Sequence, residues 1–157
     1  MTVESIDAAA RLAAAGESSL VLCAGDGTPA AARAMLPRLP EVCFVHAGPA
    51  DLAPAARAAA AHGLRQFVVV GRFAELAEAA GGDAALADIT AAMGGDAAGT
   101  ADYYAFWEET GLLGTCGREL CRRVTDGLDA PVAAQVVLVG GADGRMVGMY
   151  GRLAPAR

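Results

Sequence analysis

Three short apolar runs in the first half of the chain alternate with Ala-rich segments. The runs are Leu20–Gly25, Val42–Gly48 and Phe67–Gly71, and each ends in a glycine-containing turn. Continuous apolar runs of this length are typical of strands covered on both faces, and the Ala-rich segments between them supply the covering helices. The pattern predicts a three-layer α/β fold around a mostly parallel, doubly wound sheet.

The pattern changes after the third run. Helical segments separated by glycines occupy about residues 83–127, and two strand-like runs follow, Ala134–Val139 and Met146–Tyr150. The link between these runs, Gly140–Arg145, is too short for a crossover, so it predicts a C-terminal antiparallel hairpin at or near a sheet edge. We therefore expect a single α/β domain over residues 1–157, with a helical insertion at about 83–127.

Residues with capping propensity predict where the helices begin. The predicted N-terminal caps are Ser5, Thr28, Asp51, Asp83, Thr100 and Thr115. His62 lies at the predicted end of the helix that begins after Asp51, where a cation complements the helix dipole. Glycines follow several of the predicted helix ends, as expected for C-terminal caps.

Composition narrows the class of protein. Hydrophobic residues make up 55% of the chain, yet no run approaches the ~18 uncharged apolar residues of a membrane span. The net charge of −6 argues against nucleic-acid binding. The N-terminus is acidic rather than basic, so we expect a cytoplasmic protein without a secretion signal. The four cysteines lack metal-site spacing, so we expect reduced thiols and no metal.

Three turns carry the candidate chemistry because ligands usually bind at the carboxyl ends of parallel strands. The turns Gly25–Thr28, His46–Gly48 and Gly71–Arg72 are therefore expected to line one crevice. The first turn lacks the third glycine of a dinucleotide fingerprint, so a tight turn without a ligand is an equal alternative.

Side chains in these turns have two interpretations each. His46 is a candidate proton acceptor or a structural histidine, and Arg72 could hold a carboxylate or phosphate or be an exposed turn residue. Asp26 could accept hydrogen bonds from a ribose or an ammonium group, or cap its own turn. The chain contains no lysine, which excludes Schiff-base chemistry.

Two further groups of side chains lie in the predicted helical segments. The aromatic segment Tyr103–Trp107 predicts either the hydrophobic anchor of the helical layer or a wall of the crevice. Acidic residues in the helical segments are spaced like solvated helix faces rather than catalytic pairs; they are Glu75, Glu78, Glu108 and Glu109.

The order of these motifs resembles the C-terminal half of the CbiD family, the cobalt-precorrin-5B C(1)-methyltransferases of anaerobic cobalamin biosynthesis. The similar segments are Leu20–Gly27, His46–Gly48, His62–Gly71, Phe106–Val124 and the strand before Asp143. Where the family has a Gly-His-x-Gly-Lys-Leu turn, this chain reads Gly-Arg-Phe-Ala-Glu-Leu. It also has no counterpart of the family's Thr-His-Ser-Arg segment, and we expect the family's N-terminal domain to be absent.

The resemblance implies a Rossmann-like domain that binds S-adenosylmethionine and a tetrapyrrole substrate. Carried over, the donor-binding residues are Gly25, Asp26, Gly27, Thr28, Gly48 and Gly71, and the catalytic candidates are His46 and Arg72. It implies C-methyltransfer to a cobalt-precorrin, in full or degenerate form, by a homo-oligomer or with a partner subunit. The alternative is a non-catalytic α/β domain that binds a small molecule or a partner, so enzymatic activity is left open.

Overall fold

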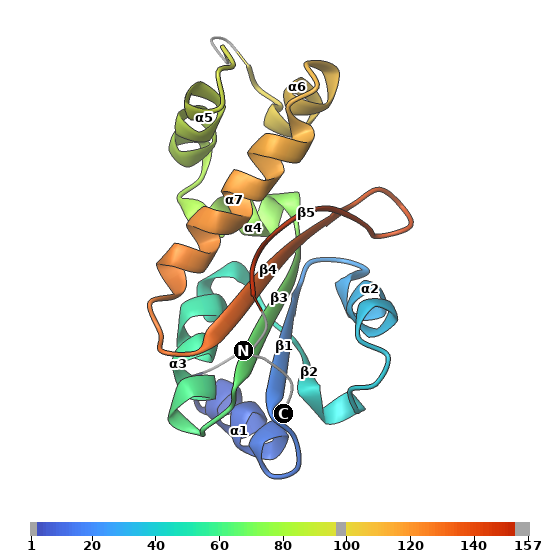
Figure 1. Ribbon diagram of the computed structural model, residues 1–157, viewed down its shortest axis with the longest axis vertical. Helices are drawn as coiled ribbons and strands as arrows, with labels where there is room; N and C mark the ends of the chain where they lie inside the picture. Colours follow the sequence, from blue (N-terminus) through green and yellow to red (C-terminus); the bar gives the residue numbers. More distant parts are fainter. Residues whose placement is uncertain (1–2, 97–99, 153–157) are drawn as a thin grey trace.

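The computed structural model describes residues 3–96 and 100–152, and these residues form a five-stranded sheet with helices on both faces (Figure 1). The strand order is β2-β1-β3-β4-β5. The strands are β1 (Ser19–Ala24), β2 (Phe44–His46), β3 (Gln66–Arg72), β4 (Ala133–Gly140) and β5 (Arg145–Gly151). The first four strands are parallel and β5 is antiparallel to β4 at the edge. The predicted α/β class, mostly parallel sheet and C-terminal hairpin are confirmed.

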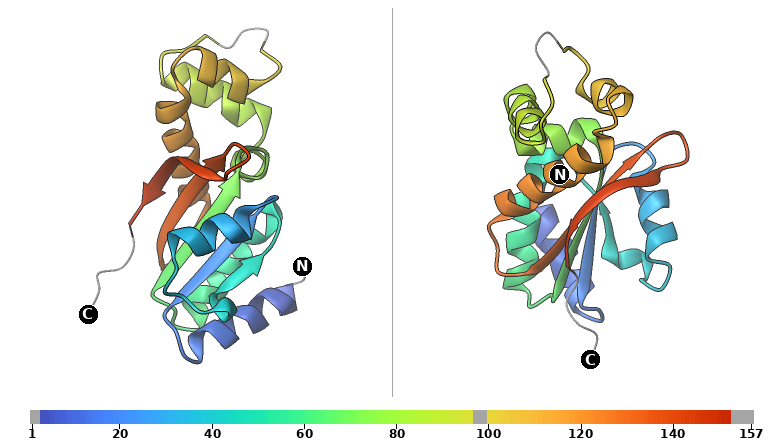
Figure 2. Two further views of the ribbon diagram at one scale, coloured as in Figure 1. Left: turned by 90° about the vertical axis from the view of Figure 1, so that its right-hand side faces the viewer. Right: turned by 45° about the horizontal axis from the view of Figure 1, so that its top comes forward.

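Two helical layers of unequal size cover the sheet (Figure 2). One face packs against α1 (Val3–Ala14), α3 (Leu52–Ala61), α4 (Phe73–Ala80) and α7 (Leu113–Leu128), and the other against α2 (Thr28–Met35). Alternate strand residues point to opposite faces. The larger core contains Leu20, Leu22, Phe67, Val69, Val136 and Leu138, and the smaller one contains Val21, Cys23, Val68, Val70, Val137 and Val139.

The second strand is shorter than the sequence predicts. Only Phe44–His46 pair with β1, and the residues before them, Glu41–Cys43, form a single 3-10 turn. β2 lies at the edge of the sheet; Phe44 and Val45 are half-buried and His46 is exposed. Val42, predicted to lie in this strand, is 41% exposed. The predicted strand was therefore too long, but Val45 and Phe44 still pack against the cores on opposite faces of the sheet.

Two predicted caps show how the turns are held. Thr28 is the first residue of α2 rather than its cap, and its hydroxyl donates to the Gly25 carbonyl at 2.6 Å. The capping position is Gly27, in the left-handed conformation with φ 76°. Asp51 does precede α3 as predicted, but its carboxylate accepts from the Gly48 N–H at 2.9 Å. Both side chains therefore stabilise the turns after β1 and β2.

The remaining predicted caps are displaced by one to three residues. α1 includes Ser5, and α5 (Asp83–Ala92) is capped at Gly82 rather than at Asp83. α6 (Tyr103–Glu109) is capped by Asp102, whose carboxylate accepts from the Ala105 N–H at 3.0 Å, so the cap at Thr100 was wrong. α7 begins two residues before Thr115. His62 ends α3 as predicted, and its Nε2 lies 2.8 Å from Asp7 of α1.

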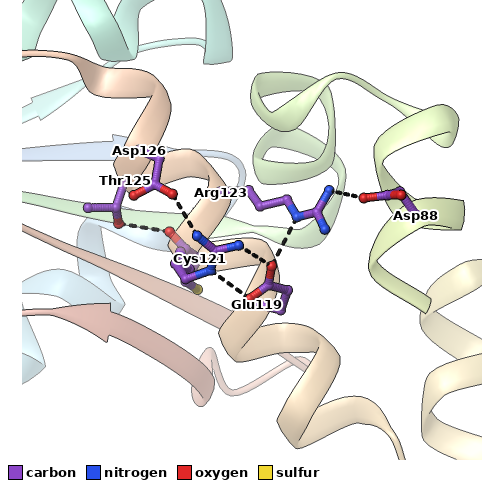
Figure 3. A network of polar contacts seen from close by, with 7 residues as sticks. Asp88, Glu119, Cys121, Arg123, Thr125 and Asp126 are labelled. Carbon is purple, nitrogen blue, oxygen red and sulfur yellow. Dashed lines mark hydrogen bonds and ion pairs between the residues drawn. The ribbon is translucent and has the colours of Figure 1, made fainter. Parts of the chain in front are cut away.

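The helical insertion between β3 and β4 lies partly over the sheet and partly beyond the carboxyl ends of the strands. α7 packs on β4 and β5, while α5 and α6 extend past the end of the sheet (Figure 1). Arg123 joins α7 to α5, since its guanidinium donates to Asp88 at 2.5 Å and to Glu119 at 3.1 Å (Figure 3). Trp107 joins α6 to α5 by donating from Nε1 to the Thr90 hydroxyl at 2.8 Å.

Candidate functional site

The strand order reverses between β1 and β3. The chain leaves β1 through α2 towards β2 on one side, then returns through α3 to β3 on the other side. In open α/β sheets this switch point, at the carboxyl ends of the strands, is the usual place for a ligand. Here it is bounded by Gly25 after β1 and by Arg72 at the end of β3.

A pocket of about 420 Å³ opens at this point, and we name it the switch-point pocket. Its lining comes from the turn after β1, the start of α4, α6 and the end of β4. The lining residues are Asp26, Arg72, Phe73, Ala74, Glu75, Tyr104, Val139, Gly140 and Gly141. The volume lies within the range of about 300–1,000 Å³ that small-molecule sites occupy.

Arg72 connects two walls of the pocket. Its Nη1 donates to the Asp26 carbonyl at 3.3 Å, and its Nη2 donates to the Gly141 carbonyl at 2.9 Å. It forms no ion pair with any residue that the structure describes. A guanidinium carries five N–H donors, so three of them remain for a ligand, and the positive charge is not neutralised by a neighbouring carboxylate.

Arg72 also lines a smaller adjoining pocket of about 240 Å³, which we name the hairpin pocket. It lies between α2 and the β4–β5 turn. Its lining residues are Gly27, Ala30, Ala31, Ala34, Arg72, Ala142, Asp143 and Gly144. The first turn of the chain therefore contributes to both pockets, through Asp26 on one side of Arg72 and Gly27 on the other.

Gly25 allows Glu75 and Arg72 to pack directly over the first turn. Its φ of 109° is a conformation that favours glycine. A Cβ at this position would lie 2.9 Å from Glu75 Oε2 and 3.1 Å from Arg72 Cγ. Glu75 Oε2 is buried and has no hydrogen-bond partner among the described residues. One residue that lines the pocket thus has a buried carboxylate oxygen whose hydrogen-bonding capacity is unused.

The aromatic segment has both of the roles that the sequence left open. Trp107 is fully buried and Phe73 packs edge-on against it, with ring centroids 5.4 Å apart, so it anchors the helical layer. Tyr104 lies 5.4 Å from the same Phe73 ring and lines the pocket. A Cβ at Gly140 would lie 2.6 Å from the Tyr104 hydroxyl, which places that hydroxyl directly on the end of β4.

The three predicted turns do not all reach this pocket. Asp26 and Arg72 line it, and Gly27 lines the hairpin pocket. His46 is exposed at the end of β2, and neither it nor Gly48 lines either pocket. Because β2 and β3 flank β1 on opposite sides, their ends lie about 10 Å apart.

Gly71 and Thr28 have structural reasons for their positions. A Cβ at Gly71 would lie 2.6 Å from Leu76 Cδ2, so this glycine permits close packing of α4 on β3. Thr28 is fully buried and holds the Gly25 carbonyl. Both residues shape the turns that bound the switch-point pocket, while neither lines it.

Sequence reasoning missed Glu75, Gly140 and Gly141 as residues of the site, whereas a wall formed by the aromatic segment that contains Tyr104 was one of its two alternatives. Glu75 was expected on a solvated helix face, but it lies in the first turn of α4, directly after the turn that carries Arg72. Its spacing of three residues from Arg72 was the available signal, since residues three apart at a helix start share one side. Gly140 and Gly141 reach the site only through the pairing of β4 with β3.

The cysteines offer no reactive thiol to the site. All four are free and buried, and burial raises the pKa of Cys23 to about 11 and that of Cys121 to about 12. Thiols with such pKa values are poor nucleophiles at neutral pH. Among residues 3–96 and 100–152, no three His, Cys, Asp or Glu side chains gather as a metal site. Nor does any helix there have the length and apolar character needed to cross a bilayer.

Comparison with curated proteins finds three relatives that share one name. The chain is 40% identical over 169 residues to a cobalt-precorrin-5B C(1)-methyltransferase of Salinispora arenicola (strain CNS-205), covering 90% of this chain and 44% of that protein. The protein of the same name from Salinispora tropica is 40% identical over 167 residues, with 89% and 43% covered. That from Rubrobacter xylanophilus is 35% identical over 147 residues, with 80% and 37% covered.

No protein-family model and no solved structure matches the chain. The three relatives carry the same name, and they align with most of this chain. This name is that of the family that the first turns and residues 62–71 resemble. The chain spans less than half the length of the curated relatives it matches. Within that span, the chain belongs to the CbiD family, and the three relatives are named cobalt-precorrin-5B C(1)-methyltransferase.

Proposed function

We propose that this chain supplies the donor-binding domain of an S-adenosylmethionine-dependent C-methyltransferase that acts on a cobalt-precorrin in cobalamin biosynthesis. The observation that carries the proposal is the coincidence of two findings. Three relatives are named cobalt-precorrin-5B C(1)-methyltransferase, and a pocket of suitable size opens at the switch point of the sheet.

The residues present fit the methyl donor. Its ammonium group and ribose hydroxyls need hydrogen-bond acceptors, and the pocket offers the carboxylates of Asp26 and Glu75. Its carboxylate needs donors, and Arg72 retains free N–H groups there. Tyr104 and Phe73 supply aromatic surface, which is the kind of lining that small-molecule sites combine with a few polar groups.

The donor supplies an electrophilic methyl group when it is bound. The contribution of this chain is to fix the donor's position, so that the methyl group faces an acceptor carbon in line; such orientation can account for much of the rate of a transfer reaction. The turns around Gly25 and Gly140 are narrow and tied together by Arg72. They restrict how a ligand can lie in the pocket. His46 stays a predicted proton acceptor, exposed at the neighbouring edge strand.

Calorimetric titration of the chain with S-adenosylmethionine and S-adenosylhomocysteine tests donor binding. We expect both to bind in the micromolar range, and the absence of binding at millimolar ligand would overturn the proposal. Methyl transfer is then measured with methyl-labelled donor and a cobalt-precorrin acceptor. Donor binding without transfer would instead support the alternative, a binding domain that depends on another chain for chemistry.

A further inference from the structure

The switch-point pocket contains an unsatisfied acceptor. Glu75 lies in the first turn of α4 and lines the pocket, and its Oε2 is buried without a hydrogen-bond partner among the described residues. Buried polar atoms in folded proteins nearly always have a partner, and an unpaired one in a pocket needs an explanation. A ligand that brings a hydrogen-bond donor to this carboxylate would provide it.

The aliphatic part of Arg72, a residue of opposite charge, lies beside this acceptor. Glu75 Oε2 and Arg72 Cγ lie 2.9 and 3.1 Å from a single point, the position of a Cβ at Gly25. Their charged groups nevertheless form no ion pair with each other, because the guanidinium is turned to the carbonyls of Asp26 and Gly141. A carboxylate residue and a guanidinium residue therefore line the same pocket without pairing with each other.

This arrangement selects among ligand groups. A phosphate would be attracted by Arg72 and repelled by Glu75 and by the exposed Asp26. A nucleoside without a charged group would leave the guanidinium without a counter-ion. A group with an ammonium and a carboxylate on one carbon meets both charges at once, and charge-assisted hydrogen bonds to both ends are the stronger kind.

We propose that the switch-point pocket binds the α-amino-acid end of the methyl donor as a zwitterion, with Glu75 accepting from the ammonium and Arg72 donating to the carboxylate. This inference rests on the proposed function and adds which end of the donor the pocket takes. It assigns a role to Glu75 in ligand binding, and it assigns the carboxylate on Arg72 to the donor rather than to the tetrapyrrole.

The test uses two ligands that differ only in the amino-acid part. S-adenosylhomocysteine carries it, and 5′-methylthioadenosine has the same nucleoside and sulfur without it. Each is titrated calorimetrically into the wild-type chain, into Glu75→Gln and into Glu78→Gln. Glu78 lies three residues further along α4 and is exposed, so it is the matched control for the loss of one charge on the same helix.

We expect Glu75→Gln to lower the affinity for S-adenosylhomocysteine about ten- to hundred-fold, which is the range for loss of a hydrogen bond to a charged group. The affinity for 5′-methylthioadenosine should stay within two-fold or so of the wild-type value, and Glu78→Gln should change neither. Glutamine has the shape of glutamate, and removing an unpaired buried charge does not destabilise a fold. Thermal melting should therefore confirm an intact Glu75→Gln protein.

The outcomes separate this inference from the proposed function. If the wild-type chain binds neither ligand, donor binding itself fails and the inference fails with it. If the wild-type chain binds S-adenosylhomocysteine and Glu75→Gln binds it equally well, the inference is overturned while donor binding stands. An equal loss for both ligands would also overturn it, because Glu75 would then contact the nucleoside or act on the shape of the pocket.

Discussion

Gly27 and Gly63 form a matched pair that tests whether the first turn touches a ligand. Both have φ of 76°, and a Cβ at either position would meet no atom within 4 Å. They differ in location. Gly27 caps α2 and lines the hairpin pocket beside Arg72, whereas Gly63 follows α3 at the opposite end of the sheet, before β3. Alanine at each position has the same backbone cost and a different relation to the site.

The backbone cost can be worked out from the dihedral angle. A residue with a Cβ in the left-handed region is disfavoured by about 1–2 kcal/mol. For a domain of this size each kcal/mol lowers the melting temperature by about 2–4 °C. Gly27→Ala and Gly63→Ala should therefore each lower the melting temperature by about 2–8 °C, measured by circular dichroism. A large difference between the two would refute the reasoning from the dihedral angle.

Affinity for S-adenosylhomocysteine should separate the two variants. We expect Gly63→Ala to bind like the wild type and Gly27→Ala to bind about ten-fold more weakly, because glycine serves where backbone approaches a ligand closely. Gly27→Asn distinguishes obstruction from strain, since asparagine tolerates the left-handed conformation but adds bulk. It should melt near the wild-type temperature and still bind weakly. Equal calorimetric affinities for both alanine variants would show that the turn does not touch the ligand.

Three further predictions concern the helical insertion and its contact with the pocket. Hydrogen bonds from two arginines lower the pKa of Glu119 from 4.5 to about 2, so its stabilisation is complete above about pH 4.5 and lost as pH falls towards 2. Allowing for the exposed arginine, the ionised form of Glu119 contributes about 1–2 kcal/mol to the free energy of unfolding. A plot of melting temperature against pH should therefore be flatter for Glu119→Gln than for the wild type. Parallel plots for the two proteins would contradict this. Trp107→Phe removes the 2.8 Å bond to Thr90 and buried volume, and should cost about 2 kcal/mol in urea denaturation. Gly140→Ala pushes a methyl against the Tyr104 hydroxyl and should cost about 1–3 kcal/mol; adding Tyr104→Phe should recover part of this, and no recovery would place the strain elsewhere.

The parallel core was predictable because its signals are local. An apolar run, a glycine turn and an Ala-rich helix follow one another within a few residues around β1 and β3, and the short link before Arg145 permits only a hairpin. The predicted edge strand was too long because the apolar residues of a sequence do not show how many neighbouring strands a strand will have. Val42 is apolar and exposed. Composition and periodicity cannot distinguish such a residue from an apolar residue in a buried strand.

Only part of the site was predictable from the sequence, because local sequence patterns do not determine the order of the strands in the sheet. The sequence places the turns of β1, β2 and β3 in succession, but the order β2-β1-β3 sends His46 to one edge and brings Gly140 next to Arg72. Tyr104 comes from the helical insertion, where an aromatic residue is expected in the core. Its contact with Gly140 depends on how α6 lies over the end of β4, and no periodic pattern encodes that placement.

The side chain of Arg72 connects the parts of the switch-point pocket that come from the two halves of the chain. Arg72 belongs to β3, in the middle of the sheet, and it donates to a carbonyl in the first turn and to a carbonyl in the last. These carbonyls belong to Asp26 and Gly141, so the two rims of the switch-point pocket are joined before any ligand arrives. A ligand that binds a preformed site does not have to order it, which leaves more of its interaction energy as affinity. Since the same guanidinium keeps unused donors and Arg72 lines the pocket, this residue can hold the walls together and bind an anionic group at the same time.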